Sequence, residues 1–165
     1  MEHIRPAGPS DHPRCVELLT TLRASVTSVR GGADLLTLGV TAPDSRSAHT
    51  AELTDPRTLV ERWSSDPTGA TLLVGEYEGA LVGLAAGTID RGVRTVGRIE
   101  CCYVEEEARA VGVGHGLIEG LLTWFAEQGC SDVDALALPG DRSTKQLLEG
   151  SGFRARLLVL HRPLG

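Results

Sequence analysis

The stretch "YVEEEARAVGVGHGL", residues 103–117, places glycine at three alternate positions, Gly112, Gly114 and Gly116, at the start of an apolar helical pattern. Glycine within a helix costs about 1 kcal/mol relative to alanine, so this pattern needs a reason. The first four amides of a helix have no internal partner, and the helix dipole gives them partial positive charge. Glycines leave those amides open to an anion such as pyrophosphate, with the cation of Arg109 beside them. The alternative is that glycine only allows close packing of the helix on a sheet.

Two familiar phosphate-binding patterns do not fit this stretch. A Walker loop ends in glycine, lysine and a hydroxyl residue, whereas residues 115–117 supply neither the lysine nor the hydroxyl. A dinucleotide fingerprint begins at the end of a strand, but seven residues separate Val104 from Gly112, and the third glycine comes one residue early. Asp134 does lie about twenty residues further on, where a ribose-binding acid would stand, so nucleotide binding stays an alternative.

The hydrophobic periodicity on either side of this stretch predicts strands and helices in the order β-α-α-β-β-β-α-β-α-β. The expected elements are a strand at 3–7, helices from residue 10 and from residue 54, a hairpin over 71–90, a strand at 98–104, a helix ending at Gly129, a strand at 132–138, a helix at 141–152 capped by Asp141, and a last strand at 153–164. No repeat or linker divides the chain, so we expect residues 1–165 to form one α/β (α+β) domain.

Composition limits the class of protein. The net charge of −6 argues against a nucleic-acid partner and suits an amine-bearing one. The N-terminus lacks the apolar core of a signal peptide and no run of eighteen apolar residues occurs, so we expect a cytoplasmic protein without a membrane partner. Lys145 is the single lysine among sixteen basic residues, a skew typical of GC-rich bacteria, which predicts a bacterial source.

The four cysteines show no pattern of a metal site. Cys101 and Cys102 are adjacent and would point to opposite faces of a strand, and the chain has no Cys-x-x-Cys or His-Glu-x-x-His motif. We therefore expect reduced thiols and no metal.

The strand-to-helix stretch resembles the acyl-CoA-binding motif of the GCN5-related N-acetyltransferase (GNAT) family, with Val104 ending the strand and Arg-x-x-Gly-x-Gly at 109–114. The resemblance covers nearly the whole chain and includes the family's ending Glu-x-x-Gly-Phe at 149–153. It implies a mixed, mostly antiparallel twisted sheet flanked by helices. It also implies acetyl-CoA as cosubstrate, an amine acceptor that is a small molecule or a peptide, and compatibility with a homodimer.

The resemblance also implies how each residue would hold acyl-CoA. The main chain of Cys102, Tyr103 and Val104 would pair with the pantetheine arm as if it were a strand. The pyrophosphate would lie on the stretch that consists of Arg109, Ala110, Val111, Gly112, Val113, Gly114, His115 and Gly116. Asp141 stands where the family usually has an asparagine that contacts the cofactor.

Glu100 is the candidate catalytic base. A primary amine is mostly protonated at neutral pH, so its attack on a thioester benefits from a base, and several relatives carry a glutamate four residues before the strand-ending valine. Alternation along a strand predicts that Glu100 shares a face with Cys102 and Val104, opposite Ile99. A salt bridge from Arg98 or Arg94 is the structural alternative for this carboxylate.

One departure from the family concerns the leaving group. Many members carry a tyrosine just before the glutamate of Glu-x-x-Gly-Phe to protonate the thiolate, whereas this chain has Leu148. A non-catalytic acyl-CoA-binding or regulatory module is therefore the second hypothesis. The long polar segment 30–53 carries Asp34, Asp44 and His49, which would suit an amine acceptor.

Overall fold

Five strands form one sheet in the order β1-β2-β3-β4-β5, in which every neighbouring pair is antiparallel except β4 and β5, which are parallel. The computed structural model describes residues 1–32, 55–157, 160, 162 and 164. The elements are β1 (Glu2–Pro6), α1 (His12–Thr27), α3 (Pro56–Ser65), β2 (Ala70–Tyr77), β3 (Ala80–Arg91), β4 (Thr95–Val104), α4 (Val113–Glu127), β5 (Asp132–Ala135) and α5 (Arg142–Gly150), with short 3-10 helices at Pro9–Asp11 and Glu106–Ala108. The expected mixed, mostly antiparallel sheet flanked by helices is confirmed.

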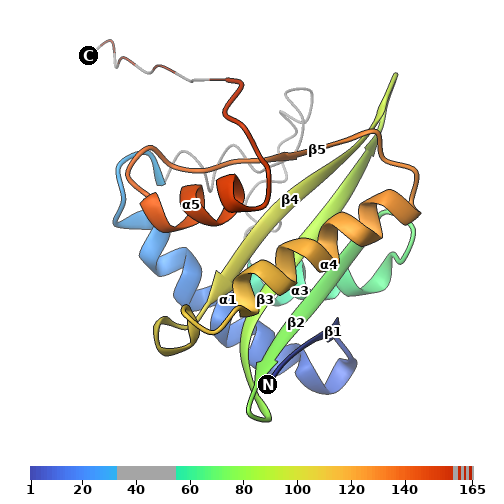
Figure 1. The fold of residues 1–165 in the computed structure, drawn as a ribbon, viewed down its shortest axis with the longest axis vertical. Helices are drawn as coiled ribbons and strands as arrows, with labels where there is room; N and C mark the ends of the chain where they lie inside the picture. The colour runs from blue at the N-terminus through green and yellow to red at the C-terminus, as the bar shows by residue number, and fades with distance from the viewer. Residues whose placement is uncertain (33–54, 158–159, 161, 163, 165) are drawn as a thin grey trace.

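Helices cover both faces of the sheet, α4 and α5 on one and α1 and α3 on the other (Figure 1). The apolar face of α4 was correctly predicted: Val113, Leu117, Ile118, Leu121 and Phe125 are fully buried, while Leu122 is half-buried. The second cluster joins Leu18 and Leu19 of α1 to Val60 and Trp63 of α3. Each cluster buries its apolar side chains against one face of the sheet, and the sheet therefore lies between two helical layers.

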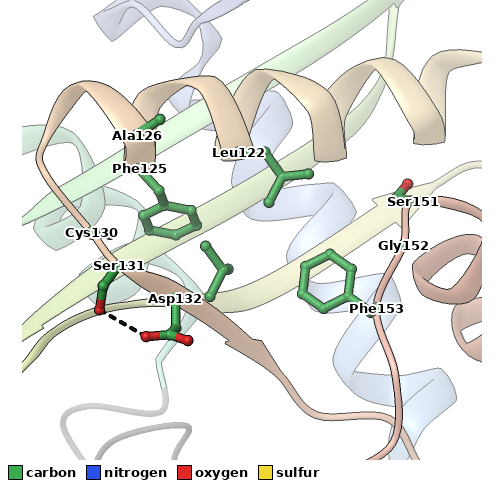
Figure 2. A pocket seen from close by; sticks show the side chains of 10 residues that line it. Leu122, Phe125, Ala126, Cys130, Ser131, Asp132, Ser151, Gly152 and Phe153 are labelled. Atoms are coloured by element: carbon green, nitrogen blue, oxygen red, sulfur yellow. Dashed lines mark hydrogen bonds between the residues drawn. The ribbon is translucent and has the colours of Figure 1, made fainter.

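The ring of Phe125 packs directly against two glycines of the sheet. A Cβ on Gly97 would lie 2.5 Å from Cδ1 of the Phe125 ring, and one on Gly87 would lie 2.6 Å from its Cζ. Any side chain there would therefore displace the ring. This contact fixes α4 against β3 and β4, and Figure 2 shows the ring pointing from the helix toward the sheet.

Several helix ends follow the sequence signals. Asp141 accepts a hydrogen bond from the amide of Thr144 (3.0 Å) and begins α5 as expected. Asp55 does the same for the amide of Thr58 (3.0 Å), so α3 begins at Pro56, two residues after the predicted start at residue 54. Gly129, with φ +76°, follows the end of α4, as its position in the sequence predicts.

The strands β4 and β5 are paired along only part of their length. Their register runs from Val96 opposite Asp132 to Ile99 opposite Ala135. β4 continues to Val104, whereas β5 ends at Ala135, three residues before the predicted limit. In Figure 1 the two strands separate beyond the paired segment. The last part of β4 therefore has β3 on one edge and no β5 residue on the other.

The predicted strand over 153–164 is wrong for the residues that the structure describes there. Residues 153–157 have no strand conformation, and Leu157, Leu160 and Leu164 are exposed. The backbone turns at Gly152, with φ +86°, and no described residue of this segment joins a strand ladder, so its apolar pattern alone does not make a strand. Asp34, Asp44 and His49 lie outside the described residues.

A methyl group under the Phe125 ring should destabilise the fold. We expect Gly97→Ala to lower the free energy of unfolding by about 1–3 kcal/mol, because the ring has to move. The matched control is Gly92→Ala, where the nearest atom to an added Cβ is an oxygen of Asp90 at 3.6 Å. Urea denaturation measures both, and equal stability of the two variants would contradict the packing described.

Candidate functional site

Glu100 lies at an irregularity where β3 and β4 change register. Ala86 pairs with Cys101, but its neighbour Gly87 pairs with Ile99, so Glu100 has no residue opposite it. This arrangement is a β-bulge, with one extra residue on β4. Bulges redirect the side chains on either side of them, and this one decides which face each residue of β4 presents.

For this reason the prediction that Glu100 shares a face with Cys102 and Val104 is wrong, although Glu100 does lie opposite Ile99. Ile99, Cys102 and Val104 all pack with the cluster around α4, although simple alternation would separate Ile99 from the other two. The carboxylate of Glu100 instead accepts a hydrogen bond from the hydroxyl of Thr88 on β3, on the face covered by α1 and α3. Glu100 and Cys102 therefore lie on opposite faces of the sheet.

The surroundings of Glu100 favour its neutral form. Burial raises the pKa of this carboxyl above its ordinary value, and this effect outweighs the hydrogen bond from Thr88 and the charges of Arg62 and Arg98, which lower it. A carboxylate with a raised pKa binds protons better than an exposed glutamate does. It is thus better suited to accept a proton from an amine than an exposed glutamate is.

The arginines considered as partners of Glu100 have other partners. Arg94 forms an ion pair with Asp132 at the start of β5. Arg98 binds Asp90, with 3.2 Å between its Nη2 and the carboxylate, and its charge also acts on Glu100. The direct hydrogen bond to Glu100 comes from Thr88, which the sequence did not single out because a threonine in a strand is ordinary.

The three glycines of the opening stretch have three different surroundings. Gly112 precedes α4 with φ +92°, a left-handed conformation that L side chains rarely adopt. Gly116 faces β1, where an added Cβ would lie 2.9 Å from Cγ1 of Ile4. Gly114 is different, because an added Cβ would meet only Leu147 at 3.5 Å and Val104 at 3.7 Å, which are ordinary contacts. The fold therefore requires glycine at 112 and favours it at 116, but gives no such reason at 114.

The amides at the start of α4 lie at the end of β4. The first main-chain bond of the helix runs from the amide of Gly116 to the carbonyl of Gly112, at 3.0 Å. The amides of Val113, Gly114 and His115 precede it and have no main-chain acceptor among the described residues. Together with the helix dipole they form a concentration of donors suited to an anion.

Arg109 connects this helix start to the strand. Its Nε donates to the carbonyl of Val104 at 3.1 Å, so part of its role is to close the end of β4. Its charge also acts on Asp141. Burial would raise the pKa of Asp141, but hydrogen bonds from Thr144 and Ser143, with the charge of Arg109, hold it below the ordinary value. The sequence-predicted residues of β4, the glycine stretch and α5 thus meet at one place.

Three further side chains near this place are limited in what chemistry they offer. His115 is exposed, with its Nδ1 3.5 Å from the hydroxyl of Ser151. Leu148 is buried in the core cluster around α4. Burial raises the pKa of the Cys102 thiol to about 12 and raises that of Cys101 further, so neither is a ready thiolate nucleophile.

The hollow in Figure 2 lies elsewhere. It has a volume of about 310 Å³ and lies between the second half of α4, the start of β5 and Phe153. Its lining includes Leu122 and Phe125 but no residue of the glycine stretch. The site that the sequence pointed to is therefore the open edge of β4 and the start of α4. An open strand edge that leads to free helix amides is chemically suited to an extended ligand with an anionic group.

Comparison with known families identifies the chain further. The family model described as the acetyltransferase (GNAT) family matches residues 38–153, more than half of the 165 residues. The chain belongs to the GNAT acetyltransferase family, whose members use acetyl-CoA. No curated protein sequence matches the chain.

Solved structures share the fold at low sequence identity. An acetyltransferase of Trypanosoma brucei has a TM-score of 0.62 and 24% identity over 99% of this chain and 100% of its own. A mutant protein of Bacillus halodurans has a TM-score of 0.76 and 17% identity over 98% and 99%. AAC(6′)-Iy in complex with the bisubstrate analogue CoA-S-monomethyl-acetylneamine has a TM-score of 0.62 and 17% identity over 99% and 98%.

The described residues contain no helix long and apolar enough to cross a membrane. Within the same part of the chain, no three histidine, cysteine or acidic side chains gather in a way that could hold a metal ion.

Burial of Glu100 should make stability depend on pH. Because its folded pKa lies above the unfolded one, the stability that this group contributes is present below the unfolded pKa and is lost as pH rises through the folded pKa. Glu100→Gln removes this titration, so we expect it to raise the melting temperature at pH 8 more than at pH 4. Glu119→Gln, at an exposed position on α4, is the control and should change neither. An equal effect of Glu100→Gln at both pH values would contradict the assignment.

Proposed function

We propose that this protein transfers an acyl group, normally acetyl, from acyl-CoA to a primary amine. The observation that supports this proposal most directly is that the open edge of β4 beyond Ile99 leads to the free amides at the start of α4. An extended pantetheine arm can pair with the strand edge, and a pyrophosphate can accept hydrogen bonds from the helix amides. The bisubstrate analogue in AAC(6′)-Iy contains CoA, which is consistent with this use of the fold.

The residues that would hold acyl-CoA come from three elements. The main chain of Cys102, Tyr103 and Val104 would pair with the pantetheine arm. The pyrophosphate would be bound by the stretch of Arg109, Ala110, Val111, Gly112, Val113, Gly114, His115 and Gly116. Asp141 is a less direct candidate, because its carboxylate already begins α5 and its charge would repel a phosphate. We therefore assign it the role of holding the start of α5 beside Arg109.

Glu100 would act as the general base for the acceptor amine. The amine nitrogen forms a bond to the thioester carbonyl carbon, and its proton passes to Glu100 directly or through a water molecule. The carbon–sulfur bond then breaks, and CoA leaves as a thiolate. Glu100 projects on the face of α1 and α3, so we place the acceptor there and the acyl-CoA along the β4 edge.

The departing thiolate would take its proton from solvent. Leu148 is buried and has no exchangeable proton, so the residue at the position of the family's usual acid cannot protonate the thiolate. A thiol has a pKa near 8.5, which makes its thiolate a tolerable leaving group at neutral pH. The same leucine is the observation that favours the second candidate, an acyl-CoA-binding module without catalysis. Acyl-CoA binding without turnover of any amine, small or peptide, would support that candidate.

Gly114 should be the most sensitive position for CoA. We expect Gly114→Ala to raise the dissociation constant for CoA by roughly tenfold or more, because its methyl group would stand among the free helix amides that would bind the pyrophosphate. Stability should be kept, since alanine favours a helix over glycine. Gly112→Ala is the contrasting variant and should lose about 1–2 kcal/mol of stability through its positive φ. Calorimetry with CoA and with NAD, beside urea denaturation, measures these effects. Unchanged CoA affinity in folded Gly114→Ala, or a preference for NAD, would contradict the proposed site.

Glu100 should be required for turnover but not for CoA binding. We expect Glu100→Gln to lower kcat/KM by at least about 100-fold, since general base catalysis contributes about that much or more. The assay is release of free thiol from acetyl-CoA with a panel of small and peptide amines. Glu119→Gln is again the control. Turnover by Glu100→Gln at the rate of the unchanged protein would remove Glu100 from the mechanism.

A further inference from the structure

We propose that Thr88 is a positioning residue for the transfer reaction: its hydroxyl holds the carboxylate of Glu100 in the orientation that meets the acceptor amine. The inference rests on the proposed function, because it gives Glu100 the role of base. It starts from one contact, the hydrogen bond that the Thr88 hydroxyl donates to Oε1 of Glu100 across the two strands.

The bulge is the reason that Glu100 needs such a partner. A residue in a regular ladder has its direction fixed by the pleat and by a neighbour directly opposite. Glu100 has no residue opposite it, because Ala86 pairs with Cys101 and Gly87 with Ile99. Gly87 presents its side-chain position to Phe125 on the opposite face, so it cannot support the carboxylate. Thr88, the next residue of β3, is the one that reaches it.

Thr88 itself is held firmly. It lies within β3, paired with Ala70 of β2 on one side and Arg98 of β4 on the other. A threonine has few side-chain rotamers because it branches at Cβ. Its hydroxyl therefore offers a donor at a nearly fixed place. With Oε1 engaged by Thr88, Oε2 is on this inference left to accept the proton of the amine.

The charged groups around Glu100 predict the effect of removing this contact. Arg62 acts on Glu100 from α3 and Arg98 from β4, while the neighbouring thiol of Cys101 lies on the same face. From α1, the thiol of Cys15 acts on Cys101. Burial raises the pKa of Glu100, and the hydrogen bond from Thr88 is the largest effect that lowers it. Without that bond the pKa of Glu100 rises further.

The test is the pH dependence of kcat/KM in the thiol-release assay, with acetyl-CoA and an amine that the protein acetylates. The acidic limb is the part of that profile in which kcat/KM falls as Glu100 becomes protonated. We expect Thr88→Val to move the acidic limb to higher pH and to lower kcat/KM by roughly tenfold at pH values below it, because less Glu100 is deprotonated and its orientation is lost. Thr88→Ser keeps the hydroxyl and should restore the limb to its original position. Thr71→Val changes a half-buried threonine of β2 in the same way and should leave the limb unmoved.

The outcomes separate this inference from the proposed function. If Glu100→Gln abolishes turnover and Thr88→Val leaves the limb in place, Thr88 does not position the base, although the proposed function stands. If Thr88→Val lowers kcat/KM at every pH equally and Thr88→Ser does not rescue it, the role of Thr88 is only structural and the inference is wrong. If Glu100→Gln keeps full turnover, the proposed base itself fails. Urea denaturation of each variant identifies any loss that comes from unfolding.

Discussion

The parting of β4 and β5 after Ile99 is the constraint on which the rest of the site depends. A strand edge carries main-chain donors and acceptors that need partners, and β3 satisfies only one edge of β4. Had β5 continued alongside to Val104, no ligand could pair with that edge. The short β5 therefore leaves a gap, and the start of α4 lies at its end. An extended ligand can complete the strand and place its anionic group on the helix amides without any change in the sheet.

The bulge at Glu100 directs neighbouring side chains of β4 to different faces of the sheet. It turns Ile99, Cys102 and Val104 toward α4, where they support the helix that would bind phosphate. It turns Glu100 toward α1 and α3, away from that negative charge. A buried carboxylate opposes folding at neutral pH, so this residue costs stability in the form in which it would act. Such a cost is expected where a group serves chemistry rather than packing.

Much of this arrangement could be predicted from the sequence, and the failures have identifiable causes. The order of elements up to α5, the cap at Asp141 and the buried face of α4 follow from local signals, and the structure agrees with them. The face of Glu100 could not be predicted, because a bulge depends on how two strands pair and alternation assumes that they pair regularly. Residues 153–157 failed as a strand because strand formation needs a hydrogen-bonded neighbour, which an apolar pattern does not supply. The separate reasons for Gly112, Gly114 and Gly116 likewise required the backbone and its neighbours.

In the proposed reaction, the buried Leu148 leaves proton removal from the amine as the step that needs a side chain most. An alkyl amine with a pKa near 10 is almost fully protonated at pH 7, whereas a thiol with a pKa near 8.5 gives a thiolate that can leave without an acid. Removing the amine's proton is therefore the harder of the two transfers. A protein without an acid for the leaving group therefore loses less of its reaction rate than a protein without a base for the amine. The chain has an apolar side chain at Leu148 and holds Glu100 with a threonine and two nearby arginines, a distribution of polar groups that matches the greater need for the base.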